Sequence, residues 1–234
     1  MLKVGSNAVY RGTMSQEALK VQAARAALDY VLPRLKRESV IGIGTGSTSN
    51  CFIDALAAHK GKFDAAVASS EASAQRLRGH GIAVIDLNAA NDIVVYVDGA
   101  DEVNPARQMI KGGGAALTRE KIVAASSREF VCIVDESKCV ATLGRCPLPV
   151  EVIPMARGLV ARGLVALGGQ PVYREGVVTD NGNVVLDVYG LDLADPLSME
   201  MRINNLVGAV CNGIFAAQAA HVVFVAGKAG IRRM

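Results

Sequence analysis

Tryptophan is missing from this chain, and phenylalanine and tyrosine together account for only 4% of its 234 residues. A chain of this length buries a sizeable core, and here that core must consist of aliphatic side chains. Such cores are typical of α/β proteins whose parallel strands are covered on both faces. Hydrophobic residues make up 51% of the sequence and charged residues 20%, an ordinary globular composition that argues against a disordered chain.

A strong charge of either sign is also missing. The formal net charge is +3, and the basic residues are dispersed apart from Arg232 and Arg233. No basic stripe with stacking aromatic residues indicates a nucleic-acid-binding surface. Residues 1–13 lack the apolar run of a signal peptide, and no later stretch resembles a transmembrane span. We therefore expect a cytoplasmic protein that binds neither nucleic acid nor membranes.

Cysteine and histidine are too few and too scattered for the usual cross-links or metal sites. The five cysteines form an odd set with no secretory signal before them, which argues against a disulfide framework. Cys132, Cys139 and Cys146 recur every seven residues, a spacing that no common zinc site uses. The three histidines include no His-Glu-x-x-His pair. We expect reduced thiols and no metal.

Short apolar runs alternate with helical patterns up to about residue 146. This alternation predicts an α/β fold with a doubly wound, mostly parallel, Rossmann-like sheet, in which ligands bind at the carboxyl ends of the strands. The strand at 92–97 is almost wholly β-branched and should be central. We expect helices over residues 15–32 (with Ser15 as N-cap), 51–56, 71–77 and about 115–127, and strands over 40–43, 65–68, 83–87, 92–97 and 130–134.

The pattern changes at Pro147-Leu-Pro149. Beyond it the order β-α-β-β-α-β predicts a small ferredoxin-like α+β insert, and Asn181-Gly182 indicates a hairpin. We expect strands over 150–153, 172–173, 176–179, 184–188 and 210–215, helices over 155–167 and 196–206, and a return to the main sheet at 222–225. The predicted domains are a disordered extension at 1–13, a catalytic domain of residues 14–146 plus about 218–234, and an insert of about 147–217.

A glycine-rich turn joins the first predicted strand to the next helix and reads Ile41-Gly-Ile-Gly-Thr-Gly-Ser-Thr48. The backbone N–H groups of such a turn suit an anion such as phosphate. The alternative is an ordinary tight turn with a Ser or Thr N-cap. A Walker loop would need a lysine before Ser47 or Thr48, and a dinucleotide fingerprint would need glycine in place of Ser47, although Asp64 lies near the spacing of a ribose ligand.

Three carboxylates, an ammonium group and three glycines follow within two dozen residues. Asp98 and Asp101 come after a buried strand, Lys111 precedes Gly112–Gly114, and Glu120 lies near the start of a helix. Each has a structural alternative: an Asp-Gly turn, a flexible surface loop, or an acidic residue that complements a helix dipole. Together they suit proton transfer beside a carbonyl with stabilisation of an oxyanion.

Lys138 follows the predicted strand at 130–134 and therefore lies at the same sheet edge. It can reach a phosphate there, although a lone lysine is more often solvated surface. Four loops at one sheet edge thus carry anion-binding and proton-transfer groups, and this convergence predicts an active site.

Several contiguous motifs resemble ribose-5-phosphate isomerase of the A type. They are Ile43-Gly-Thr-Gly-Ser-Thr48, Tyr96-Val-Asp98-Gly-Ala-Asp101-Glu, Met109-Ile-Lys111-Gly-Gly-Gly-Ala-Ala-Leu-Thr-Arg-Glu120-Lys, Pro147-Leu-Pro-Val-Glu-Val-Ile-Pro154 and Gly176-Val-Val-Thr-Asp-Asn-Gly-Asn183. The resemblance runs from about residue 14 to residue 231. It implies interconversion of D-ribose 5-phosphate and D-ribulose 5-phosphate through an enediolate, in the non-oxidative pentose phosphate pathway. It also implies a homodimer or homotetramer without metal or cofactor.

The resemblance implies a role for each matching residue. Glu120 would be the general base that moves a proton between C2 and C1, and Lys111 with the backbone of Gly112–Gly114 would stabilise the enediolate. Asp98 and Asp101 would assist opening of the sugar ring and proton movement on its hydroxyls. The residues expected to bind substrate oxygens and the phosphate are Thr45, Gly46, Ser47, Thr48, Gly99, Ala100, Lys138 and Lys20. Because a free Glu has a pKa near ~4.3, we expect a desolvated pocket to raise the pKa of the base.

Two other functions fit parts of the sequence. A sugar-phosphate sensor would need a DNA-binding segment, for which residues 1–13 are too short, and it would have no use for Glu120 beside Lys111. A dinucleotide-dependent oxidoreductase would use the turn at 42–46, and Ser47 in place of glycine argues against it.

Overall fold

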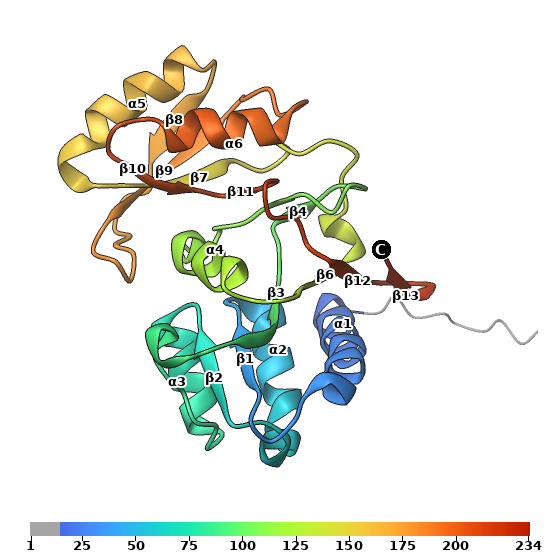
Figure 1. Cartoon of the computed structure of the whole chain (residues 1–234). Coiled ribbons are helices and arrows are strands. Elements are labelled where there is room, and N and C mark those ends of the chain that lie inside the picture. The colour runs from blue at the N-terminus through green and yellow to red at the C-terminus, as the bar shows by residue number, and fades with distance from the viewer. Residues whose placement is uncertain (1–14) are drawn as a thin grey trace, which may run out of the picture.

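Six strands form the central sheet of the computed structural model, which describes residues 15–234 (Figure 1). Their order is β13-β12-β6-β3-β1-β2, and every neighbouring pair is parallel except β12 and β13. The predicted central strand is β3, which lies between β6 and β1. The extension predicted at 1–13 lies outside the described residues. The strands are β1 (Val40–Ile43), β2 (Ala65–Ala68), β3 (Ile93–Asp98), β6 (Phe130–Asp135), β12 (Val222–Gly227) and β13 (Gly230–Arg233).

Helices cover both faces of this sheet. Successive residues of a strand point to opposite sides, so buried apolar strands expose an apolar surface on each face that helices must cover. Ile41 and Ile43 pack in one core with α1 (Gln16–Val31) and α2 (Ser47–Leu56), whereas Tyr96 and Phe130 pack in another core with α4 (Leu117–Ala125). The helix α3 (Glu71–Gly79) packs against the edge strand β2. Ser15 is the N-cap of α1, as predicted, and its side chain accepts a hydrogen bond from Ala18 N.

A second, antiparallel sheet is built from the part of the chain that was predicted as a ferredoxin-like insert (Figure 1). Its order is β10-β7-β9-β8, and two helices cover its own apolar core. The elements are β7 (Leu148–Val152), α5 (Arg157–Ala166), β8 (Gln170–Tyr173), β9 (Val184–Tyr189), α6 (Pro196–Asn204) and β10 (Ala209–Asn212), in the predicted β-α-β-β-α-β order. The domain boundaries at about 147 and 217 stay a prediction.

Three short strands connect the two sheets, in the order β11-β5-β4. They are β4 (Glu102–Val103), β5 (Met109–Ile110) and β11 (Ile214–Phe215). Strands of two residues are too short to produce a recognisable alternation of apolar and polar residues in the sequence. The strand β4 follows Asp101 directly, and β5 leads directly into Lys111. The Lys111 N–H donates to Gly213 O at 2.9 Å, so this small sheet holds the predicted site segment between the two larger sheets.

The strand predicted at 83–87 is wrong. Only one residue there, Val84, forms a bridge with Ala66 of β2. The Asp86 side chain then accepts a hydrogen bond from Asn88 N and starts a 3-10 turn, which ends the pairing. A local Asp side chain therefore competes with the sheet for the backbone and prevails.

Two predictions in the insert also differ. Residues 176–179 are not a strand, because β9 pairs with β8 and residues 174–183 form the long connection between them. The tip keeps the predicted turn, with Gly182 N–H donating to Thr179 O at 2.8 Å. The strand predicted at 210–215 is divided at Gly213 between β10 and β11. A Cβ atom on Gly213 would lie 2.2 Å from Lys111 O, so the chain passes too close here for any larger residue.

None of the helices in residues 15–234 combines the length and the apolar character needed to cross a membrane.

Candidate active site

A cleft of about 190 Å³ lies at the carboxyl ends of β1, β3 and β6, beside the glycines that follow β5. Every residue that the sequence analysis assigned to the site lines this cleft, except Asp98. Gln16 and Asp135 line it as well and were not expected. The fold therefore brings together the predicted loops at one edge of the sheet.

Asp98, the last residue of β3, is fully buried behind the wall of the cleft. A buried carboxylate is stable only if hydrogen bonds replace the water that it loses. Five donors do so: Thr45 N (3.0 Å), Ser49 Oγ (2.9 Å), Gly99 N (2.7 Å), Tyr96 Oη (2.5 Å) and Lys111 Nζ (2.7 Å). The carboxylate thus links the glycine-rich turn after β1 to the lysine after β5.

Gly44 makes room for this carboxylate. A Cβ atom at residue 44 would lie 1.9 Å from Asp98 Cγ, so no other residue type fits without displacing Asp98. Gly46 is needed for a different reason, since its φ of 106° lies in the region that side chains disfavour. The glycines of this turn therefore serve close packing in one case and backbone geometry in the other.

Lys111 is buried against acceptors and charges of the opposite sign. Its Nζ donates to Asp98 Oδ2 at 2.7 Å and to Gly99 O at 2.5 Å, and it lies 3.3 Å from Glu120 Oε2. Burial disfavours the ammonium form, but the charges of Asp98 and Glu120 outweigh that effect and raise the pKa of Lys111 above its ordinary value. Lys111 therefore places a fixed positive charge at the cleft.

Glu120 lies in the first turn of α4, where it lines the cleft and is only 4% exposed. Its Oε2 pairs with Lys111 but makes no hydrogen bond with any other residue of 15–234. Burial, together with the nearby charge of Asp98, raises the pKa of Glu120 above the ordinary 4.5, against the opposing effect of Lys111. A carboxylate in this state is a stronger base than one in water.

The turn from Thr45 to Thr48 presents an open helix end to the cleft. The N-cap of α2 is Gly46, and no side chain caps the first amides of this helix. The Ser or Thr N-cap of the alternative interpretation is therefore wrong. Lys20 and Lys138 line the same cleft, and two ammonium groups beside a helix N-terminus suit an anion such as phosphate.

The structure contradicts the role of Asp64 in a dinucleotide site. Asp64 immediately precedes β2, so it lies at the amino end of the strand, whereas the cleft lies at the carboxyl ends. A ribose ligand at the glycine-rich turn would not reach it.

The Gly112–Gly114 loop closes the cleft on the side of the second sheet. Gly112 has a φ of 109°, and its carbonyl accepts a hydrogen bond from Ala115 N at 2.9 Å. The Gly113 N–H donates to Asp101 Oδ2 at 2.8 Å, so this amide is already occupied in the structure. Asp101 is half-buried and lines the cleft, in contrast to Asp98.

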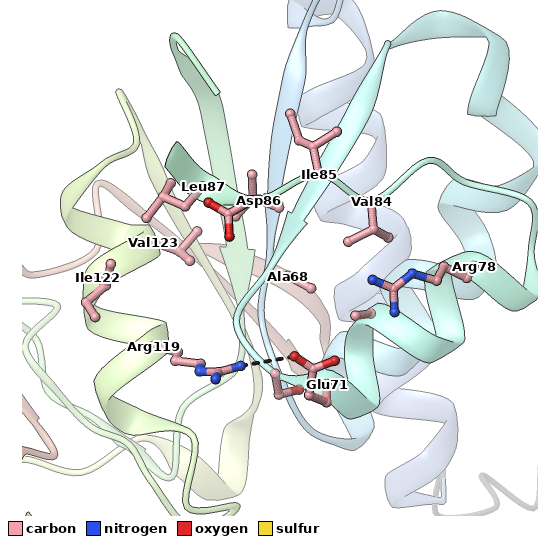
Figure 2. Close-up of a pocket in the computed structure, with 13 residues that line it drawn as sticks. Ala68, Glu71, Arg78, Val84, Ile85, Asp86, Leu87, Arg119, Ile122 and Val123 are labelled. Atoms are coloured by element: carbon pink, nitrogen blue, oxygen red, sulfur yellow. Dashed lines mark hydrogen bonds and ion pairs between the residues drawn. The ribbon is translucent and has the colours of Figure 1, made fainter. Parts of the chain in front are cut away.

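The helix that carries Glu120 is held on three sides by the residues next to it. Figure 1 shows α4 between the two larger sheets, and it contacts β7 and β10 of the second one. The tethers are Thr118 to Glu151 of β7, Lys121 to Glu200 of α6 (2.6 Å), and Arg119 to Glu71 of α3 (3.2 Å). The last pair borders another cavity of about 440 Å³, which contains none of the predicted site residues (Figure 2).

The residues that hold Asp98 and the helix of Glu120 in place were not identified from the sequence. Tyr96 left a signal, because residues two apart in a strand share a face and it therefore lies on the same side as Asp98. Ser49 of α2 left a weaker signal in the sequence. Glu151 is fully buried and accepts hydrogen bonds from Thr118, Thr179, Asn181 and Asn183, a set that no local pattern reveals.

Comparisons with known proteins agree with this geometry. A family model for ribose 5-phosphate isomerase A (phosphoriboisomerase A) matches residues 65–230. Ribose 5-phosphate isomerase A from Neisseria gonorrhoeae is 46% identical over 95% of this chain and 98% of that one, with a TM-score of 0.91. The enzyme from Methanocaldococcus jannaschii is 38% identical over 94% and 99%, with a TM-score of 0.87. A D-ribose-5-phosphate isomerase in complex with phospho-erythronic acid is 36% identical over 94% and 99%, with a TM-score of 0.88.

Proposed function

Because the chain belongs to the ribose 5-phosphate isomerase A family and interconverts D-ribose 5-phosphate and D-ribulose 5-phosphate in the pentose phosphate pathway, we propose here which residues perform the reaction. The conversion moves a proton between C2 and C1 through an enediolate. It therefore needs a base near both carbons and positive charge near the oxygen that becomes an oxyanion.

Glu120 is the proposed base. The observation that carries this assignment is the Glu120 Oε2 atom, which is buried in the cleft, has no partner among residues 15–234 except the Lys111 ammonium at 3.3 Å, and belongs to a group with a raised pKa. This oxygen can take a proton from C2 and return it to C1 of the same enediolate, because the carboxylate lines the cleft in which we place the substrate. Glu120 thus acts as base in one half of the reaction and as acid in the other.

Lys111 is the proposed electrostatic partner of the enediolate. Its ammonium group is fixed by Asp98 and Gly99 before substrate arrives, so no reorganisation is needed when negative charge develops on the sugar. We propose that the N–H groups of Gly112 and Gly114, for which residues 15–234 supply no acceptor, assist it. Because Lys111 supplies this positive charge, the proposed mechanism uses no metal or cofactor.

The remaining residues of the cleft hold the substrate. We assign the phosphate to the open end of α2 at Ser47 and Thr48, with the ammonium groups of Lys20 and Lys138 beside it. The sugar oxygens then lie between this end and Glu120, within reach of Thr45, Gly46, Gly99 and Ala100, which also line the cleft.

The two aspartates have different proposed roles. Asp98 does not line the cleft and already accepts five hydrogen bonds, so it positions Lys111 and the glycine-rich turn rather than contacting substrate. Asp101 lines the cleft and accepts only one hydrogen bond among the described residues, from Gly113 N. Asp101 is therefore the carboxylate that assists ring opening and proton movement on the hydroxyls.

The assembly and location of the protein are also proposals. We propose a homodimer or homotetramer, because two turns beside the second sheet expose large apolar side chains: Met155 is 97% exposed and Val207 80%. The two turns are adjacent, since Ile153 N donates to Gly208 O at 3.0 Å. We propose the cytoplasm as the location, because all five cysteines are free thiols, which suits a reducing compartment.

Replacing Glu120 with glutamine tests the base. Glutamine keeps the shape of the side chain but accepts no proton, so we expect kcat to fall by about 10²- to 10⁴-fold with little change in KM. The assay follows ketose formation from ribose 5-phosphate in the presence of EDTA, which also tests the metal-free mechanism. Glu38→Gln, at an exposed residue away from the cleft, is the matched control. Near wild-type turnover in Glu120→Gln would show that another group is the base.

Asparagine at each aspartate separates the two proposed roles. Asp98→Asn places an amide where five donors converge, and we expect the free energy of unfolding to fall by about 3 kcal/mol or more, together with kcat. Asp101→Asn should lower kcat while the free energy of unfolding stays close to wild type. Urea unfolding and steady-state kinetics measure both quantities. Wild-type stability in Asp98→Asn would contradict its role as an anchor.

Sedimentation equilibrium tests the assembly. We expect a mass of two or four times the 24.4 kDa of one chain, and we expect Met155→Asp to shift the population towards the monomer by placing a charge in an apolar contact. A wild-type protein that sediments as a monomer at micromolar concentration would contradict the proposal.

A further inference from the structure

We propose that Arg174 is a positioning residue for the isomerisation: from the second sheet, it fixes the conformation of the Gly112–Gly114 loop that borders the cleft. This inference rests on the proposed roles of Lys111 and Glu120 in the same site. It goes beyond them, because Arg174 belongs to neither the cleft nor the sequence motifs.

Arg174 contacts the loop through two backbone carbonyls. Its Nη1 donates to Gly112 O and to Gly113 O, each at 3.1 Å. The other nitrogens of the guanidinium are engaged by Asp187 of β9: Nε donates to Oδ2 at 2.8 Å, and Nη2 donates to Oδ1. Because the group is planar and rigid, the bidentate contact with Asp187 sets the direction in which Nη1 points.

The backbone of Arg174 is fixed as well. Arg174 directly follows β8, and its N–H donates to Val185 O of β9 at 3.0 Å. The backbone of Arg174 and its guanidinium group are therefore both bound to β9, which pairs with β8. The loop is held by a rigid element of the second sheet rather than by another loop.

Holding these carbonyls also orients the amides of the loop. In a trans peptide the C=O of one residue and the N–H of the next point in opposite directions. With Gly112 O directed to Arg174, the Gly113 N–H points away from it and meets Asp101 Oδ2 at 2.8 Å. By the same geometry, the Gly114 N–H points away from Arg174, and Gly114 lines the cleft.

The loop needs such an external constraint. Three consecutive glycines have more backbone freedom than any other tripeptide, and Gly113 and Gly114 are exposed. On the side of Arg174 the loop borders a cavity of about 280 Å³ that is lined by Asp101, Gly113, Lys138 and Arg174. Because there is open space behind the loop, packing alone does not fix it.

The charge of Arg174 is a weaker explanation than its geometry. The Asp187 carboxylate accepts two of its hydrogen bonds and neutralises it locally, with the two side chains 19% and 16% exposed. The pair as a whole therefore contributes little net field at the cleft. What Arg174 supplies is a fixed pair of donors to the loop.

Substitution of Arg174 tests the proposal, with phospho-erythronic acid, the compound bound in the 36% identical isomerase structure, as a competing ligand that probes the site. In Arg174→Gln we expect kcat to fall and the inhibition constant of phospho-erythronic acid to rise, each by about 10- to 100-fold, as for a misplacement of about 1 Å. The KM for ribose 5-phosphate should change less than about threefold, because the phosphate is bound by other residues. Arg174→Lys keeps the charge but not the planar donors, so it should lose most of the same activity.

Arg76→Gln is the matched control, because Arg76 forms a bidentate pair with Asp54 of the same kind but away from the cleft. It should leave kcat, KM and the inhibition constant unchanged. Thermal unfolding of each variant shows whether it is folded at the assay temperature. If Arg174→Gln fails to fold, Arg174→Lys alone decides.

Wild-type kcat in Arg174→Gln, or full activity in Arg174→Lys, would overturn the positioning role. Neither result would affect the site assignment if Glu120→Gln still loses its activity. Conversely, a loss of kcat in Arg174→Gln with none in Glu120→Gln would contradict the proposed base and leave the effect of Arg174 on the loop in place.

Discussion

The buried ion pair between Asp98 and Lys111 is the interaction on which the rest of the site depends. Two charges removed from water are costly, and this pair is stable because every part of the aspartate is hydrogen-bonded. The same contacts determine other features of the chain. Gly44 is required because the Asp98 carboxylate occupies the space of its Cβ, and the buried ammonium of Lys111 also pairs with Glu120 at 3.3 Å.

The second sheet is more than a neighbour of the catalytic cleft. Glu151 of the sheet and Glu200 of its covering helix α6 hold the helix of Glu120 through Thr118 and Lys121, which lie on either side of it. Arg174, directly after β8, holds the loop that follows Lys111. Glu120 and the loop after Lys111 are therefore oriented from the same side. The first sheet carries the anchor at Asp98 and leads into the open end of α2, to which we assign the phosphate. The site is thus assembled between two rigid elements, which suits a reaction that depends on electrostatic preorganisation.

Much of the fold and of the cleft could be predicted from the sequence, because the relevant signals are local. Buried parallel strands read as apolar runs, and the strand ends then place Asp98, Lys111 and the glycine-rich turn at one edge. The supporting residues could not be predicted, since Glu151 and Arg174 find their partners across many residues of chain. Local competition explains the false strand at 83–87, where Asp86 starts a turn. Glu120 is the least distinctive of these residues in the sequence, because its burial and raised pKa become visible only in the structure.

We propose that burial beside Asp98 and Lys111 turns Glu120 into a base suited to this reaction. A carbon-13 NMR titration of the substrate-free enzyme tests it most directly, with the Glu120 carboxyl signal assigned by its loss in Glu120→Gln. Because burial and the charge of Asp98 disfavour the ionised form, the pKa of Glu120 should lie well above the ordinary 4.5, so that the carboxyl is still protonated where exposed glutamates have already ionised. A midpoint at or below 4.5 would contradict the account.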